Sequence, residues 1–343
     1  MSGTSLDGLD IAYCSFSKSQ GSWSFELKKS ITIKYATQLI SKLKNASSFS
    51  GLELSLLDVE LGNFIGSSCT QFMASNNLPV DFIASHGHTI FHQPNNRLTL
   101  QIGNGPDICS LTGKPIICDF RTMDVAYGGQ GAPLVPIGDK LLFGTSDYCI
   151  NLGGFANISY ETDKRSIAYD ICPVNIVLNW LAQHINLEYD KDGLVAESGS
   201  ILPNLLNQLN CLEYYNTKPP KSLGKEWSDE MVIPLLDTTK CTIPDLLRTY
   251  TEHCAVQITD ILNNEQSGNV LMTGGGAFNK MLIERITALT SAKIVIPNSD
   301  IINFKEAIIF AFLGVLRWTN QINCLNSVTG SQKDNIGGAI YLP

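Results

Sequence analysis

The first residues of the chain combine small hydroxyl side chains, two glycines and an aspartate in a pattern that suits phosphate chemistry. The backbone N–H groups of such a turn can point to one side and form a nest for phosphate oxygens. The carboxylate of Asp7 can bind Mg²⁺ directly or through water. The residues of this candidate phosphate and metal site are Ser2, Gly3, Thr4, Ser5, Asp7 and Gly8. A turn with a purely structural role is the alternative.

Two further glycine turns lie in residues 151–158 and 271–279. The first joins two short apolar strands, and the second joins a strand to a helix through three successive glycines, which let the backbone approach a flat ligand closely. Neither has the G-x-G-x-x-G spacing of a dinucleotide site, and the chain contains no P-loop sequence. The candidate ligand-binding residues of these turns are Gly153, Gly154, Asn157, Gly274, Gly275, Gly276 and Asn279.

Charged side chains that suit a polar second substrate lie close together at Asp119, Arg121 and Asp124. They supply two acceptors for hydroxyl groups and one guanidinium fork for a carboxylate. An internal salt bridge beside a domain crossing is the alternative, and we weigh the two equally.

Three histidines, His86, His88 and His92, follow a short predicted strand. Residues two apart on a strand share a face, so His86 and His88 could reach one metal ion. The sequence offers no obvious set of further ligands, and we therefore favour hydrogen bonding to a substrate or to neighbouring side chains, with His86 as the candidate.

Apolar segments alternate with segments of helical periodicity, which predicts an α/β fold. We expect strands at residues 9–14, 80–84, 98–102, 115–118, 148–152, 156–160, 269–272 and 293–296. We expect helices at residues 51–75, 175–185, 278–288 and 305–318. Residues 126–136 contain three glycines and two prolines, so we expect a loop that crosses between two domains.

Length, net charge, apolar runs and cysteine content argue against several classes of protein. A chain of 343 residues is long enough for about two domains. A net charge of −8 without a basic cluster argues against nucleic acid. The longest apolar run, residues 307–316, is about half of a membrane span, and the first residues do not resemble a signal peptide. Ten cysteines without a C-x-x-C pair indicate reduced thiols in a cytoplasmic protein.

Taken together, these motifs resemble the anhydro-N-acetylmuramic acid kinases, a family within the actin and hexokinase class of ATPases. The matching segments are MSGTSLDG at 1–8, SHGHTIFHQP at 85–94, DFRTMDVAYGGQGAPLVP at 119–136, NLGGFANIS at 151–159, YDICPVN at 169–175, KSLGKEW at 221–227, MTGGGAFN at 272–279 and EAIIFAFLG at 306–314. The resemblance implies a two-lobed actin-like ATPase fold, built from duplicated ribonuclease H-like domains around an interlobe cleft. We expect residues 1–130, joined by 319–343, in one lobe and residues 131–318 in the other.

The resemblance also implies an activity. ATP and Mg²⁺ would serve a kinase that opens the 1,6-anhydro bridge of the sugar with water and phosphorylates O6, in cytoplasmic recycling of peptidoglycan. The three glycine turns would bind ATP, and Asp170 stands where the family has its catalytic aspartate. The residues that would contact the sugar are His86, Asp119, Arg121, Asp124 and Glu306, with Arg121 on the lactyl carboxylate. The sequence is compatible with a homodimer.

From the residues alone, other interpretations remain. Asp170 then reads as the cap of a helix that Pro173 opens, and Glu306 as a charge that complements the dipole of the helix at 305–318. A kinase for another amino sugar is one alternative function. A non-catalytic ATP-binding sensor is another, because Ile171 and Cys172 replace the Thr and Gly of the family's aspartate motif.

The start of the chain is a second departure from the family. Members have a short apolar strand before the first glycine turn, in the middle of the N-terminal sheet. Its absence would leave buried backbone groups of both neighbouring strands unpaired, at about 1–3 kcal/mol for each group. We therefore expect the natural protein to start several residues upstream of Met1.

Overall fold

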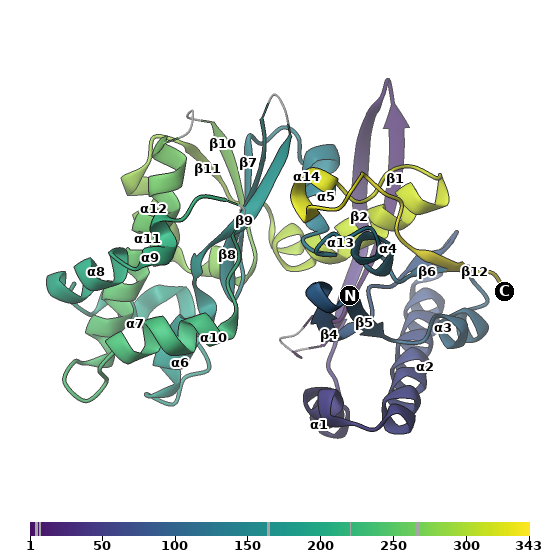
Figure 1. The fold of residues 1–343 in the computed structure, drawn as a ribbon, viewed down its shortest axis with the longest axis horizontal. Helices are drawn as coiled ribbons and strands as arrows, with labels where there is room; N and C mark the ends of the chain where they lie inside the picture. The colour runs from purple at the N-terminus through teal and green to yellow at the C-terminus, as the bar shows by residue number, and fades with distance from the viewer. Residues whose placement is uncertain (4–5, 7, 163–164, 220, 265–267) are drawn as a thin grey trace. The chain divides into compact units, whose positions relative to one another are not determined.

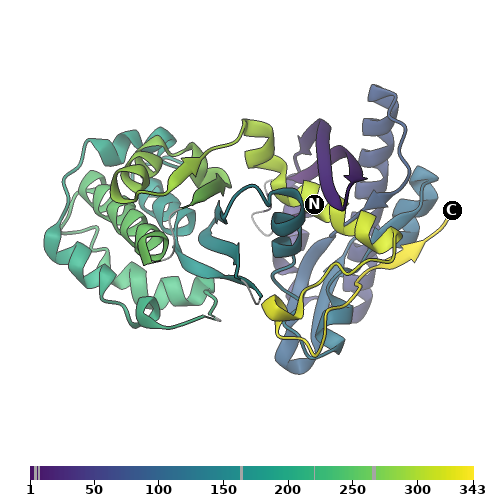
Figure 2. The same ribbon diagram turned by 90° about the horizontal axis from the view of Figure 1, so that it is seen from above.

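The computed structural model describes residues 1–343 except residues 4–5, 7, 163–164, 220 and 265–267. The chain divides into unit 1, made of Met1–Leu142 and Phe304–Pro343, and unit 2, made of Phe143–Asn303. Figures 1 and 2 show the elements of each unit. Within the described ranges, every helix is too short or too polar to cross a lipid bilayer.

Unit 1 combines short strands with helices. Its strands are β1 (Leu9–Ser19), β2 (Ser22–Ile33), β3 (Ile83–Ala84), β4 (His88–Gln93), β5 (Leu98–Ile102), β6 (Ile116–Cys118) and β12 (Ala339–Tyr341). Its helices are α1 (Thr37–Asn45), α2 (Gly51–Asn76), α3 (Gly105–Thr112), α4 (Thr122–Ala126), α5 (Val135–Leu142), α14 (Asn326–Thr329) and most of α13 (Ser299–Trp318). The long helix expected at 51–75 is confirmed as α2, which a capping box of Ser50 and Glu53 begins.

The strands of unit 1 form several small sheets. β1 pairs with β2, β3 pairs with β6 in parallel, β12 runs antiparallel to β6, and β4 and β5 form a hairpin. Among the described residues, β1 and β3 are not hydrogen-bonded to each other, and both line a cavity of about 360 Å³. Ile65 and Phe72 of α2 and Phe310 of α13 also line it.

Unit 2 contains one five-stranded sheet and most of the remaining helices. Its strands are β7 (Tyr148–Leu152), β8 (Phe155–Glu161), β9 (Ser166–Pro173), β10 (Asn269–Thr273) and β11 (Lys293–Val295). Its helices are α6 (Asn175–Gln183), α7 (Leu194–Glu197), α8 (Pro203–Asn210), α9 (Glu213–Asn216), α10 (Lys225–Trp227), α11 (Ile243–Asn264) and α12 (Lys280–Leu289). The order is β11-β10-β7-β8-β9, in which β8 alone runs antiparallel to the other four strands, as in a ribonuclease H-like domain. The expected α/β class is confirmed.

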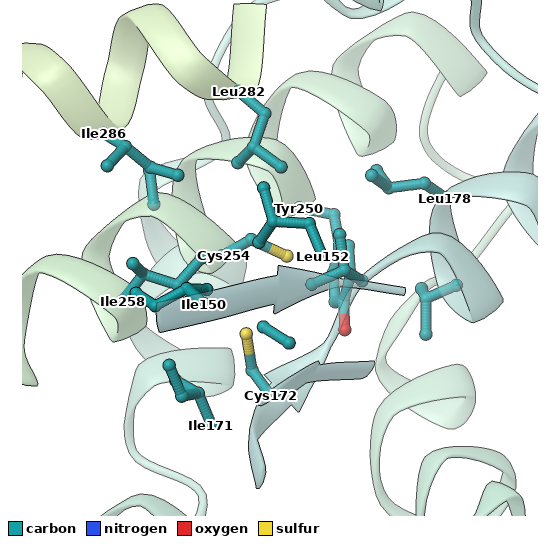
Figure 3. Packing of buried hydrophobic residues seen from close by; sticks show 14 of the residues in the cluster. Ile150, Leu152, Ile171, Cys172, Leu178, Tyr250, Cys254, Ile258, Leu282 and Ile286 are labelled. Atoms are coloured by element: carbon teal, nitrogen blue, oxygen red, sulfur yellow. The ribbon is translucent and has the colours of Figure 1, made fainter. Parts of the chain in front are cut away.

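The core of unit 2 lies between this sheet and its helices. Figure 3 shows Ile150 and Leu152 of β7, Ile171 and Cys172 of β9, and Tyr250 of α11 among the buried side chains that converge there. Each of these five side chains is at most 1% exposed. Ile150 and Leu152 of β7 therefore share the face that packs on the helices, and Asn151 between them projects from the opposite face.

The boundaries between the units differ from the expected ones. The chain passes from unit 1 to unit 2 after α5, at Leu142, and returns within α13, at Phe304, rather than near residues 130 and 318. Packing explains the difference, because Gly138 of α5 lies against Ile309 of α13. The buried ion pair of Lys305 and Asp139, at 2.7 Å, also joins α13 to α5. Loop residues 127–134 lie wholly inside unit 1.

Candidate active site

Three polar side chains lie in register across neighbouring strands of unit 2. Asn151 of β7 is paired with Asn157 of β8, and Asn157 is paired with Asp170 of β9. Directly opposed residues of antiparallel strands project from the same face, with Cβ atoms about 4.5–5.5 Å apart. All three are partly accessible to solvent. Two amides and one carboxylate thus form a polar row on one face of the sheet.

Asp170 lies within β9, immediately before a β-bulge. Ala156 pairs with Cys172 and Asn157 pairs with Asp170, so Ile171 is the extra residue of the bulged strand. Bulges redirect the side chains beside them and are common next to active sites. Helix α6 begins at residue 175, with residue 174 as its N-cap, so the interpretation of Asp170 as a helix cap is wrong.

One of the two carboxylate oxygens of Asp170 accepts a hydrogen bond. The Leu223 N–H donates to Oδ2 at 2.9 Å, and among the described residues no donor lies within hydrogen-bond distance of Oδ1. Burial raises the pKa of Asp170 above its ordinary value, although the Leu223 hydrogen bond acts in the opposite direction. A carboxylate with a raised pKa and one free oxygen is suited to accept a proton from water.

The Gly153–Gly154 turn joins β7 to β8 and contacts the start of α6. The Gly153 carbonyl accepts from Asn175 N at 3.2 Å, and the Gly154 carbonyl accepts from Val174 N at 2.8 Å. Gly154 is exposed, and the nearest atom to an added Cβ would be Ile176 Cβ at 4.0 Å. The turn therefore supports the helix through its carbonyls and presents an open backbone at Gly154, where contact with phosphate stays a prediction.

The glycines of the third turn have different roles. Gly274 has a φ of +81°, and a Cβ there would lie 2.5 Å from Oδ1 of Asn151. A Cβ on Gly276 would lie 2.8 Å from Leu152 Cβ, whereas Gly275 is exposed and has space for one. Gly274 and Gly276 thus allow the turn to pack on the end of β7, beside the polar row.

Asn279, the last residue predicted in this turn, is the N-cap of α12. Its Oδ1 accepts from Leu282 N at 3.1 Å, so this oxygen already has a structural partner. Contact between Asn279 and a nucleotide stays a prediction for its amide nitrogen.

In unit 1, two acceptors orient the guanidinium of Arg121. Its Nε donates to Nε2 of His86 at 3.0 Å, its Nη1 donates to the Gly131 carbonyl at 2.6 Å, and it lies 5.9 Å from the ring centroid of Phe310. Nδ1 of His86 lies 3.0 Å from the Gly87 carbonyl, which can only accept, so Nδ1 carries the proton. Burial, followed by the charge of Arg121, lowers the pKa of His86 well below its ordinary value. His86 is therefore neutral near pH 7.

The remaining N–H groups of Arg121 are available to a ligand. The described residues place no carboxylate oxygen within 4.0 Å of its guanidinium nitrogens. Burial lowers its pKa to about 10, against the opposing effect of Glu306, so the group stays charged at neutral pH. A half-buried, oriented guanidinium that has no ion-pair partner among the described residues is suited to bind a carboxylate in a bidentate manner.

Asp124 is completely buried and accepts four hydrogen bonds. Its Oδ1 accepts from Cys324 Sγ, Thr329 Oγ1 and Asn335 Nδ2 at 3.1, 2.8 and 2.9 Å, and its Oδ2 accepts from Gly131 N at 2.8 Å. Burial alone would raise its pKa, but these donors together lower it. The contacts indicate a positioning role for Asp124, and direct contact with a sugar stays a prediction.

Asp119 and Glu306 are both accessible to solvent. Asp119 has a left-handed φ of +57°, and its Oδ1 accepts from the N–H and hydroxyl of Thr122 at the start of α4.

Helix α13 begins at Ser299, so Glu306 lies in its interior, and the helix-dipole interpretation is wrong. Desolvation raises the pKa of Glu306, and the nearby Arg121 opposes this effect. Their contacts with a sugar stay predictions.

The N-terminal turn is only partly described. The Ser2 side chain is 2% exposed, and its Oγ lies 2.9 Å from His88 Nδ1 and accepts from the Tyr35 hydroxyl at 2.7 Å. Gly8 is buried and Gly3 is partly accessible. The predicted ligands Thr4, Ser5 and Asp7 lie outside the described residues, and so does the Mg²⁺ site at Asp7.

Several residues of the site were not singled out from the sequence. Asn151 extends the polar row, Gly131 holds Arg121 through its carbonyl, and Tyr214 and Leu223 bind Asp170. Its position as a polar residue inside an otherwise apolar strand was the available signal for Asn151. The backbone donors and acceptors have no signature in residue type.

The chain as a whole is similar to one family of known proteins. The sequence model of the anhydro-N-acetylmuramic acid kinase family matches residues 1–343. The chain belongs to this family. The anhydro-N-acetylmuramic acid kinase of Saccharophagus degradans is 34% identical, over 100% of this chain and 98% of the relative. That of Francisella tularensis subsp. novicida is 33% identical, over 99% and 97%. That of Bacillus cereus strain G9842 is 32% identical, over 100% and 98%.

Proposed function

We propose that the chain is an ATP-dependent kinase that converts 1,6-anhydro-N-acetylmuramic acid, ATP and water to N-acetylmuramic acid 6-phosphate and ADP. The match to the family over residues 1–343 carries this proposal. The environment of Asp170 supports it, because the family's reaction requires a base for water and this carboxylate has a raised pKa and one free oxygen. Cytoplasmic recycling of peptidoglycan is the corresponding role.

In the proposed reaction, Oδ1 of Asp170 accepts a proton from a water molecule whose oxygen forms a bond to C1 of the sugar. The bond between C1 and O6 breaks, and its electron pair stays on O6. O6 then bonds to the γ-phosphorus of ATP while the bond to the leaving oxygen of ADP breaks. A carboxylate beside C1 also stabilises the positive charge that develops there as the bridge opens.

We assign the remaining contacts by chemistry. The guanidinium of Arg121 binds the lactyl carboxylate, and the backbone at Gly154 and Gly275 approaches the nucleotide. ATP carries Mg²⁺, which neutralises phosphate charge in phosphoryl transfer. The described residues contain no group of three His, Cys, Asp or Glu side chains that could hold a metal.

A coupled ADP-release assay tests this function. We expect ADP and N-acetylmuramic acid 6-phosphate to form in equal amounts from ATP and 1,6-anhydro-N-acetylmuramic acid, and no ADP above background without the sugar. Free N-acetylhexosamines form the comparison panel. Phosphorylation of one of them, with the anhydro sugar left unchanged, would instead identify a kinase for another amino sugar.

Replacing Arg121 by Lys tests the contact with the lactyl carboxylate. We expect KM for the anhydro sugar to rise about 100-fold, because a charge-assisted bidentate pair is lost, while KM for ATP stays within about twofold. The analogue 1,6-anhydro-N-acetylglucosamine has no lactyl group, so its weaker kinetics should be the same for Arg121→Lys and wild type. Exposed Arg97→Lys is the matched control. An equal loss with both sugars would assign Arg121 a structural role.

A further inference from the structure

A segment from α9 to α10 packs on Asp170 through backbone as well as side-chain groups. The Tyr214 hydroxyl donates to the Asp170 carbonyl at 2.6 Å, and the Leu223 N–H donates to its carboxylate at 2.9 Å. Asp170 N in turn donates to the Lys221 carbonyl at 3.4 Å. Both backbone groups and one carboxylate oxygen of Asp170 are thus held by residues 214–223, of which residue 220 is not described.

Lys221 holds this segment in place. Its Nζ lies 4.4 Å from the ring centroid of Tyr214 and 5.7 Å from that of Tyr169, and it donates to the Tyr214 carbonyl at 3.1 Å. No carboxylate among the described residues forms an ion pair with it. A cation on two aromatic faces is stabilised by their quadrupoles without a counter-ion. Lys221 therefore links Tyr214 of α9 to Tyr169 of β9 through cation–π contacts.

The aromatic residues beside Lys221 in turn contact the core of unit 2. Trp227 of α10 packs against Tyr214 with ring centroids 5.3 Å apart. The neighbouring Tyr215 has its hydroxyl 2.9 Å from Nε2 of His253, whose Nδ1 lies 2.6 Å from Oδ1 of Asn210. Because Asn210 Oδ1 can only accept, His253 is protonated on Nδ1 and accepts from Tyr215. Burial lowers the pKa of His253 to about 3, which keeps this network neutral.

We propose that Lys221 and Tyr214 are positioning residues for the catalytic carboxylate. They hold residues 221–223 against β9, so that the Leu223 N–H occupies Oδ2 of Asp170 and Oδ1 alone faces water. This proposal rests on the function proposed above. The two oxygens of Asp170 thus have different roles: Oδ2 accepts the backbone N–H of Leu223, and Oδ1 is the base.

Loss of the Lys221 contacts should change the pKa of Asp170. The Leu223 N–H stabilises the ionised form of Asp170, so a weaker hydrogen bond raises the pKa of this carboxyl further. The acid limb of the pH profile of kcat/KM then moves to higher pH. Displacement of a catalytic group by about 1 Å lowers kcat by up to about 100-fold.

Four single substitutions test this arrangement. Lys221→Met keeps the length of the side chain and removes its charge, and we expect kcat about 10- to 100-fold lower with KM for ATP within about twofold. Tyr214→Phe removes only the hydroxyl and should lower kcat in the same direction. Lys221→Arg keeps a cation over the rings and should restore most of the activity. Exposed Lys225→Met, four residues away, removes a surface pair with Asp229 and should match wild type.

Two measurements without turnover separate this proposal from the proposed function. Hydrogen exchange at the Leu223 amide should be faster in Lys221→Met than in wild type. A ¹³C titration of the Asp170 carboxyl should show a higher pKa in the variant. Wild-type values for both in a folded Lys221→Met would overturn the proposal, whatever the substrate is. Absence of ADP release in the wild type would instead overturn the proposed function.

Discussion

Replacement of Asp170 by Asn is expected to lower kcat about 1,000-fold and to leave KM for ATP within about twofold of wild type. The amide oxygen can still accept the Leu223 N–H, but the side chain cannot take a proton from water. Because the pKa of Asp170 is raised, kcat/KM of the wild type should fall as pH decreases through a value above the ordinary one. The variant should lack this acid limb. ADP release from about pH 4 to about pH 8 measures both effects.

The matched control is Glu230→Gln, which neutralises an exposed carboxylate of unit 2 and should not change kcat. A calorimetric titration with a non-hydrolysable ATP analogue should give similar affinities for wild type and Asp170→Asn. Turnover within about tenfold of wild type, which is 1.4 kcal/mol of barrier, would mean that another group is the base. Binding of the ATP analogue without turnover, in wild type as in Asp170→Asn, would favour the alternative of a non-catalytic ATP-binding sensor.

The polar row of unit 2 shows what strand periodicity can predict. The strand expected at residues 156–160, which contains Asn157, is confirmed as β8, whereas β9, which contains Asp170, was not predicted. The register that sets these two residues opposite each other depends on the bulge at Ile171. A bulge is a property of how two strands pair, and one strand's sequence does not contain it.

The departure of this chain from the family's aspartate motif lies at this bulge. Ile171 is 1% exposed and Cys172 is 0% exposed, and both side chains pack in the core. Asp170 remains on the polar row, paired with Asn157, while the side chains of Ile171 and Cys172 lie in the core. The structure therefore gives no support from Ile171 and Cys172 to the sensor alternative.

The boundaries between the units depend on tertiary contacts. Glycine and proline content predicted a loop near residues 126–136, and the structure has a loop between α4 and α5. The crossing between units lies further along, because contact of Gly138 with Ile309 and the Lys305–Asp139 ion pair keep α5 in unit 1. These contacts join residues far apart in sequence, which local patterns do not report.

Replacement of Asp124 by Ala is expected to lower the free energy of unfolding of unit 1 by about 3–5 kcal/mol. The change leaves four donors without their acceptor, among them Asn335 Nδ2 and Gly131 N. Because Gly131 also accepts from Arg121, its displacement should raise KM for the sugar as well. Denaturant titration gives the stability. Hydrogen exchange in residues 121–131 and 323–336 shows whether the loss is local to these contacts.

The pH dependence of this loss of stability separates the contribution of the Asp124 charge from that of its packing. Hydrogen bonds lower the pKa of Asp124 in the folded state, despite burial. Its charge therefore contributes stability above its ordinary pKa, and the contribution disappears as pH falls through the lower folded-state value. The difference between wild type and Asp124→Ala should shrink on this acid side. Asp229→Ala, at an exposed pair, should change stability by less than about 0.5 kcal/mol. A similarly small loss for Asp124→Ala would show that its four donors find other acceptors, and would contradict a positioning role for Asp124.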